Sequence, residues 1–324
     1  MRSSALLAAL LALGLSAAAF AAATPKLKPT ALTAGSGKLG PGVEILTCFH
    51  KKAPPHGMEI GRIKVSMPGS GGHHVILARP FPGTLEWPPR DCPLTLNYDK
   101  WESVVQTQHP DFDWQLPPGV AINLAPKQPL LIQTHYLGNN STKKGTKYTT
   151  KTELFPIDPK TVTAHAGALF LNDRSMVVPP HSESTTTSRC TITSTGEGDQ
   201  TREVKIIGIT GHYHFRGHQF DAYRVNADGS RGELLYEYKG FDQPPFQGYS
   251  DNPIVLHPGE GVEWTCAYTN NSDKTYTFGP NAATQEHCIL FGQYYPTDTT
   301  QEAITCLHDK NPDGTDVSSI HVVH

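Results

Sequence analysis

Closely spaced turn residues divide the chain into short segments, and no long apolar run of helical period interrupts this pattern. Residues Ile60–Ser66 alternate between apolar and polar side chains, and Leu130–Tyr136 has the composition of a buried strand. The dipeptide Asp228-Gly229 favours a hairpin between Phe220–Val225 and Gly232–Tyr238. Because the chain also contains 29 glycines and 27 prolines, which disfavour helices, we predict an all-β fold of antiparallel strands.

The segment Phe155–Pro159 carries two prolines and is typical of a linker, so we place a domain boundary between residues 157 and 158. The two parts, 41–157 and 158–309, each have the size of an antiparallel β-sandwich of the jelly-roll kind. Outside them, residues 24–40 are expected to form a flexible N-terminal segment and residues 310–324 a disordered C-terminal tail.

The first residues resemble an export signal. Residues 1–23 contain a basic start, an apolar run at Leu6–Leu15 and small residues before Ala21 and Ala23, which is the pattern of a cleaved signal peptide. A retained N-terminal anchor is the alternative. No later stretch has the roughly 18 apolar residues that a membrane span needs, so we expect a mature chain without a transmembrane segment, periplasmic or extracellular.

Charge and cysteine content narrow the function further. The net charge of −3, without a long basic run, argues against a nucleic-acid partner and favours a small-molecule substrate. An even number of cysteines in an exported chain without Cys-x-x-Cys favours disulfides over zinc or redox thiols. The six cysteines allow fifteen pairings, of which sequential ones are the simplest: Cys48, Cys92, Cys190, Cys266, Cys288 and Cys306.

Histidines at close spacing indicate metal binding. In an extended strand His212 and His214 would point the same way and present two imidazoles to one ion. A surface strand with two polar residues is the alternative. The pair His73-His74 follows a glycine-rich turn whose flexibility would let both rings converge. His135 and His287 lie in apolar surroundings, where an imidazole needs a partner, although a hydrogen-bonded core histidine satisfies that need equally well.

Taken in order, His-His, Gln-x-His-Tyr, His-x-His, a Cys-flanked position and Tyr-Tyr resemble the copper type II ascorbate-dependent monooxygenases, the family of dopamine β-monooxygenase and the peptidylglycine α-hydroxylating enzyme. The resemblance extends from about Val43 to Cys306. Its further matching segments are Leu116–Val120, Gln133–Tyr136, Val178–Pro180, His212–Gly217, Tyr223–Val225, His257–Gly259, Cys266–Tyr268 and Tyr294–Pro296.

The resemblance implies two sandwich domains that face each other across a cleft, two copper ions, and hydroxylation of a C–H bond with O2 and a reductant such as ascorbate. It implies that His73, His74 and His135 hold the electron-supplying copper. It implies that His212, His214 and His287 bind the catalytic, oxygen-binding copper. It also implies the disulfides Cys48–Cys92, Cys190–Cys306 and Cys266–Cys288.

Two departures from the family weigh on function. The family has methionine where this chain has His287, and a third imidazole suits Cu(II) or Zn(II) better than a soft thioether does. Thr210, Ile289 and Phe291 stand where the peptide-hydroxylating branch has substrate-binding arginine, asparagine and tyrosine, so we do not expect peptide amidation. A non-catalytic periplasmic copper-binding or electron-relay protein is therefore the main alternative, and a zinc hydrolase is a third possibility.

Overall fold

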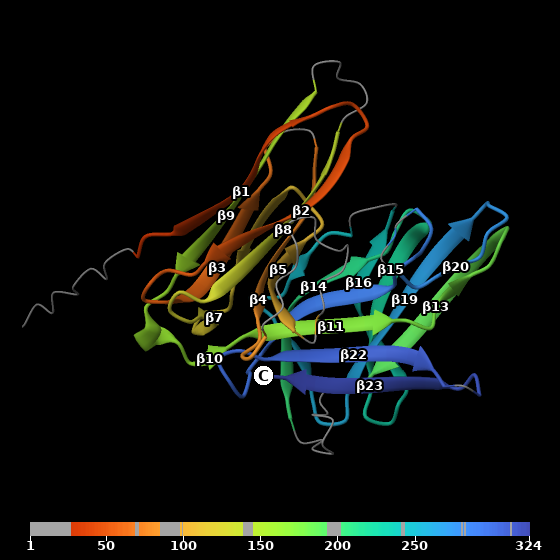
Figure 1. The fold of residues 1–324 in the computed structure, drawn as a ribbon. Coiled ribbons are helices and arrows are strands. Elements are labelled where there is room, and N and C mark those ends of the chain that lie inside the picture. Colours follow the sequence, from red (N-terminus) through yellow and green to blue (C-terminus); the bar gives the residue numbers. More distant parts are fainter. Residues whose placement is uncertain are drawn as a thin grey trace, which may run out of the picture.

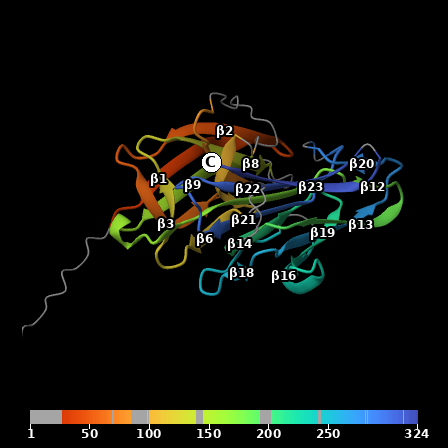
Figure 2. The ribbon, with the colours of Figure 1, turned by 90° about the horizontal axis from the view of Figure 1, so that it is seen from below.

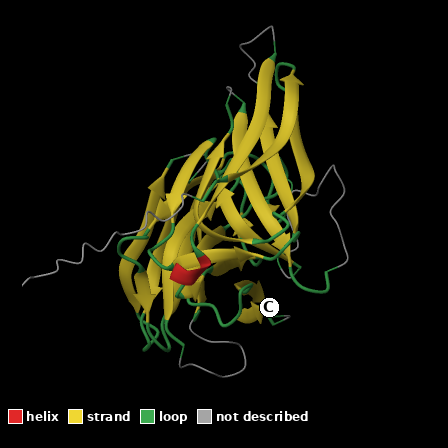
Figure 3. Cartoon of the chain, turned by 90° about the vertical axis from the view of Figure 1, so that its left-hand side faces the viewer, coloured by secondary structure: helices red, strands yellow, loops and turns green. Residues whose placement is uncertain are grey.

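The computed structural model describes residues 27–68, 71–84, 98, 100–138, 145–192, 202–240, 244–279, 281, 283–311 and 313–324. Apart from one 3-10 turn at Pro159–Thr161, the regular structure in these residues consists of β-strands (Figures 1 and 3). Most strand pairs are antiparallel, with β10 on β7 and β22 on β11 as parallel exceptions. The predicted all-β fold is confirmed.

Two sheets form the N-terminal half of the molecule. One sheet has the order β1 (Thr30–Leu39), β9 (Thr146–Pro156), β3 (Met58–Ser66), β7 (Val120–Leu124) and β10 (Ala164–His165), with β6 (Asp111–Gln115) also paired to β3. The other has the order β2 (Glu44–Lys52), β8 (Pro129–Leu137), β4 (Gly72–Pro80) and β5 (Trp101–Thr107). Their inward apolar residues, among them Ile60, Val65, Leu77, Ile122 and Ile132, form one core cluster.

Three sheets form the C-terminal half. The largest has the order β17 (Gln247–Gly248), β14 (Val204–His212), β21 (Ile289–Tyr295), β11 (Gly167–Asp173), β22 (Ala303–Lys310) and β23 (Asp316–Val323), with β18 (Ile254–Leu256) also on β14. The second has the order β13 (Ser182–Cys190), β19 (Gly261–Asn270), β15 (Gly217–Val225) and β16 (Arg231–Lys239). The third pairs β12 (Val177–Val178) with β20 (Tyr276–Thr277). Residues such as Leu171, Ile206, Phe220, Trp264 and Leu290 form the core of this half.

The two halves pack directly on each other. Strands β1, β3 and β9 lie at one end of the molecule and β12, β13 and β20 at the other (Figures 1 and 2). Between these ends, Ile207 and Phe246 of the C-terminal half join the core cluster of the N-terminal half. A hydrogen bond also joins the two halves: the Arg79 guanidinium of β4 donates to the Thr300 carbonyl at 3.3 Å.

The predicted hairpin is present, and both expectations for the chain termini are wrong. Strands β15 and β16 pair around Gly229, whose φ of +80° a glycine adopts without strain. In the segment expected to be flexible, β1 pairs with β9 and buries Leu32 and Ala34; in the expected tail, β23 pairs with β22. An edge strand needs only a few inward apolar side chains, so low overall hydrophobicity did not predict disorder here.

Two of the predicted disulfides are confirmed. Cys190–Cys306 joins β13 to β22, and Cys266–Cys288 joins β19 to the residue before β21. The third pair, Cys48–Cys92, includes a residue outside the described part of the chain, as does the predicted signal peptide. The two bonds are consistent with an oxidising, extracellular type of compartment. Among the described residues, no helix is long and apolar enough to cross a membrane.

Candidate metal centres

The first group of histidines lies where β4 meets β8. His74 stands opposite His135 in the antiparallel register, and the register shifts between Gly72 and His74. Such a bulge places two residues of one strand opposite one residue of its neighbour, so the side chains of His73 and His74 need not diverge. The three ring centroids lie 4.7–5.4 Å apart. One ring nitrogen from each falls within 4.8 Å of the others, which is close enough for one metal ion to bridge them.

The hydrogen-bond partners of this first triad select the ring nitrogen that faces the centre. The Nε2 atom of His135 lies 2.6 Å from the Glu44 carboxylate, so Nδ1 is the atom that remains for a metal. The Nδ1 atom of His74 is buried without a hydrogen-bond partner among the described residues. Burial lowers the pKa of His74 well below its usual value, and neighbouring histidines lower it further. The ring is therefore neutral at physiological pH, which is the form that binds metals.

The second group joins the end of β14 to the start of β21. His212 is the last residue of β14, His214 lies in the connection to β15, and His287 precedes β21 by two residues. The expectation of two ligands alternating along one strand is thus wrong, because the strand ends at the first of them. The three ring centroids nevertheless lie 4.3–5.5 Å apart, and their ligand atoms lie within 4.8 Å of one another.

Contacts around the second triad fix its rings. The Nδ1 atom of His214 lies 2.9 Å from the Gln285 carbonyl, to which it donates, so Nε2 faces the centre. His287 is 2% exposed, stacks on Phe278 at 5.1 Å, and has neither ring nitrogen hydrogen-bonded within the described residues. Burial lowers the pKa of His214 and lowers that of His287 well below its usual value. A buried imidazole in this state is destabilising unless a metal ion binds it.

The two triads approach the interface between the halves. The charge of His212, in the C-terminal half, is one of the causes that lower the pKa of His74, in the N-terminal half. Phe291 lies 6.3 Å from the His212 ring and also contacts Tyr98 of the N-terminal half. The residue two positions before His212 is Thr210, whose hydroxyl donates to the Pro244 carbonyl and carries no charge for a carboxylate substrate.

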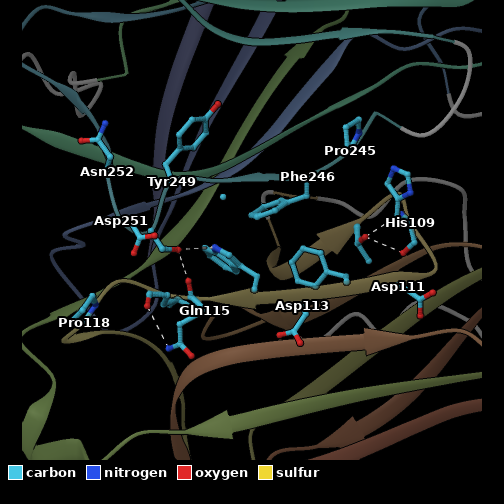
Figure 4. Close-up of a pocket in the computed structure, with 16 residues that line it drawn as sticks. His109, Asp111, Asp113, Gln115, Pro118, Pro245, Phe246, Tyr249, Asp251 and Asn252 are labelled. Atoms are coloured by element: carbon cyan, nitrogen blue, oxygen red, sulfur yellow. Dashed lines mark hydrogen bonds between the residues drawn. The ribbon is translucent and has the colours of Figure 1, made fainter.

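A groove runs between β6 and residues 244–252, so both halves contribute to its walls (Figure 4). Its volume is about 1080 Å³. Phe246 packs edge-on against Phe112 and Trp114, each at 5.1 Å between centroids, and the Trp114 indole donates to Ser250. Strand β17, in the groove wall, pairs with β14, which ends at His212. These contacts hold the strand that carries a second-triad residue against the N-terminal half.

The sequence did not predict that two carboxylates form hydrogen bonds with triad residues, one with a ring and one with a backbone N–H. Glu44 reaches His135 only because β2 pairs with β8 in one particular register, which no local pattern specifies. Glu286 was noticeable only as the neighbour of His287. Its carboxylate accepts hydrogen bonds from the His214 backbone and from Arg216 rather than facing the triad.

Comparison with known proteins identifies the C-terminal half. Residues 164–316 match the family model described as copper type II ascorbate-dependent monooxygenase, C-terminal domain. This match covers slightly less than half of the chain. The matched region contains all three residues of the second triad and both described disulfides. No curated protein matches the chain.

Two solved structures illustrate a weak similarity to the chain. The major capsid protein P2 from bacteriophage PM2 is 8% identical over 82% of this chain and 97% of its own, with a TM-score of 0.32. PNGase F, a glycosylasparaginase from Flavobacterium meningosepticum, is 11% identical over 90% of this chain and 99% of its own, with a TM-score of 0.37. Similarity at this level supports no inference about this chain.

Proposed function

We propose that this protein is an exported dicopper monooxygenase that hydroxylates a C–H bond of a small organic substrate with O2 and an external reductant such as ascorbate. One observation carries the proposal: each half of the chain contains a triad of imidazoles whose nitrogen atoms lie within metal-binding distance of one another. One of these triads lies in the region that matches the copper-monooxygenase C-terminal domain. The pattern of residues 1–23 and the disulfides support export.

The donor atoms suit copper. His73, His74 and His135 would hold the electron-supplying ion and His212, His214 and His287 the catalytic one, with the chain divided into two domains near residue 157. Bound copper would supply one-electron redox chemistry for the use of O2. Overall, one C–H bond becomes C–OH and the second oxygen atom becomes water, which consumes two electrons from the reductant and two protons.

The chain's own residues set the surroundings of this reaction. Burial lowers the pKa of His287, which keeps its imidazole neutral, and removes water from around this residue, which is 2% exposed. The ring of Phe291 lies 6.3 Å from that of His212 and 5.3 Å from that of Phe170, so buried apolar side chains lie beside the second triad. With uncharged Thr210 at the position of the family's carboxylate-binding arginine, these rings favour an uncharged or aromatic substrate over a peptide C-terminus.

A non-catalytic copper-binding or electron-relay role is the second candidate, and the third imidazole favours it. Because nitrogen donors stabilise Cu(II) more than a thioether does, His287 would make reduction of the second ion harder than in relatives with methionine. A zinc hydrolase is disfavoured. Its conceivable general base, Glu286, is fully buried and already accepts hydrogen bonds from Arg216 and the His214 backbone.

Copper titration and oxygen uptake together test the proposal. The full-length protein should bind two copper ions, whereas His135→Ala and His287→Ala should each bind one. Ascorbate-driven oxygen uptake should increase with at least one member of a panel of amines, phenols and aliphatic compounds, with formation of the hydroxylated product. Two bound ions without substrate-dependent uptake would support the electron-relay role, and a preference for zinc over copper would refute both copper roles.

A further inference from the structure

We infer that Glu286 and Arg216 form a positioning pair that sets the spacing of the second triad by tying the segment with His214 to the segment with His287. The inference rests on the proposed metal-binding role of this triad. Neither residue contacts the centre itself. The pair acts through the backbone of the ligand-bearing segments, and three sets of contacts support this role.

The carboxylate of Glu286 is fully buried and is shared between two backbone donors and one side chain. Its Oε2 accepts from the His214 N–H at 2.9 Å, and its Oε1 accepts from the Arg216 N–H at 3.2 Å. The Arg216 guanidinium also donates to Oε1, at 2.9 Å. The turn that carries His214 is therefore attached to one carboxylate at both of its ends.

The backbone around Glu286 is held from the other side. Its N–H donates to the Thr277 carbonyl at 3.0 Å, and its carbonyl accepts from Gly279 at 3.1 Å. The residue before it, Gln285, accepts the Nδ1–H of His214 at 2.9 Å, and the residue after it is His287. Displacement of Glu286 would therefore move the carbonyl that orients one imidazole and the backbone that carries another.

Arg216 is itself fixed in place. Its guanidinium lies 3.3 Å from the centroid of the Tyr276 ring and donates to the Ala283 carbonyl at 3.2 Å, while its own carbonyl accepts from Thr269. A buried carboxylate needs an opposite charge nearby, and here the charge that supplies it is anchored independently of the triad. The pair can thus hold its geometry before any metal ion binds.

In Glu286→Gln, one of the two carboxylate oxygens becomes an NH2 donor, so either the His214 N–H or the Arg216 N–H would lose its acceptor, the charge that pairs with Arg216 would be lost, and the two segments could separate. Partners that orient metal ligands typically contribute 10- to 100-fold to affinity. We therefore expect Glu286→Gln to weaken Cu(II) binding at the second triad by roughly 10- to 100-fold and to change its Cu(II) EPR hyperfine splitting.

The test uses the full-length chain with His135→Ala, so that the second triad is the site under observation. Copper affinity and Cu(II) EPR spectra are compared for this background alone and with Glu286→Gln, Arg216→Gln or Glu302→Gln. Glu302 is the matched control, because it is fully buried and paired with Arg202 in the same half without contacting the triad. The substitution Glu302→Gln should lower the thermal stability but leave the copper affinity and the EPR spectrum of the His135→Ala background unchanged.

The outcomes separate this inference from the proposed function. If the background binds no copper, or binds it equally well after His287→Ala, the proposed second site itself is wrong. If the background binds copper and Glu286→Gln behaves like Glu302→Gln, the positioning role is refuted. Should Glu286→Gln not fold, Arg216→Gln decides: a shifted EPR spectrum with an affinity loss of about threefold or more supports the role, and an unchanged spectrum overturns it.

Discussion

Replacing His287 with methionine should stabilise the metal-free protein, although it removes an imidazole from the second triad. Both ring nitrogens of this residue are buried without hydrogen-bond partners among the described residues, and only 2% of the residue is exposed. A buried polar group in this state costs about 1–3 kcal/mol. Methionine presents no polar nitrogen to the same space and adapts to irregular surroundings. We therefore expect the free energy of unfolding of the metal-free protein to rise by about 1–3 kcal/mol.

Urea denaturation in the presence of a chelator measures this change. The matched control is His165→Met, because the Nε2 atom of His165 already lies 3.2 Å from the Glu59 carboxylate and its loss should bring no gain. Copper should reverse the advantage of the variant. At a free Cu(II) concentration of about 100 times Kd, each occupied site adds about 2.7 kcal/mol to the parent, while the weakened second site of His287→Met adds less.

A lower stability of metal-free His287→Met than of the parent would refute the reasoning, since it would mean that the imidazole makes favourable contacts without a metal ion. Equal stabilisation of parent and variant by Cu(II) would show that His287 is not a ligand. If, in addition, the variant showed ascorbate-dependent oxygen uptake that the parent lacks, the natural protein would not work as its methionine-containing relatives do.

Three further predictions concern the pH dependence of stability, the carboxylate of Glu44 and the contact between the halves at Phe246. The folded-state pKa values of His74, His214 and His287 are lowered, so the unfolded chain binds more protons than the folded chain below about pH 6.5. The free energy of unfolding of the metal-free protein should therefore fall between pH 7 and pH 5, by up to about 1.4 kcal/mol per pH unit for each histidine. Denaturation at both pH values measures this change. Glu44→Gln should weaken copper binding at the first triad about tenfold in a copper titration. Phe246→Ala should lower the free energy of unfolding by about 1–3 kcal/mol, because it removes two edge-on aromatic contacts between the halves; an unchanged value would show that these contacts are not stabilising.

Local sequence patterns predicted the fold class and the members of the triads for separate reasons. Alternation along Ile60–Ser66 and the Asp228-Gly229 turn depend on neighbouring residues, and both survive in the fold as β3 and the β15–β16 hairpin. Close spacing selected His73, His74, His212 and His214, and apolar surroundings selected His135 and His287. Their convergence depends on pairings between distant segments, which the resemblance to a family supplied and local physics did not.

The sequence could not reveal features that arise from register and from loop bonding. A bulge at Gly72 brings His73 and His74 to one centre, and the strand that was expected to carry His214 ends at His212. The same limit applies to the termini. Both β1 and β23 are edge strands. The partner of β1, β9, lies far away in the sequence, and β23 has few inward apolar residues, so composition alone suggested disorder.

With copper bound in both triads, as proposed, the charges beside them would give a direction to electron transfer. Both triads offer three imidazoles, so their donor atoms alone would give bound copper similar reduction potentials. Glu44 places a negative charge on His135, which favours Cu(II) in the first triad, whereas the positive Arg216 near His214 is neutralised by Glu286. The first ion should therefore be the stronger reductant and pass electrons toward the second. Redox titration tests this order: Glu44→Gln should raise the potential of the first ion toward that of the second, and an unchanged difference between the two would contradict it.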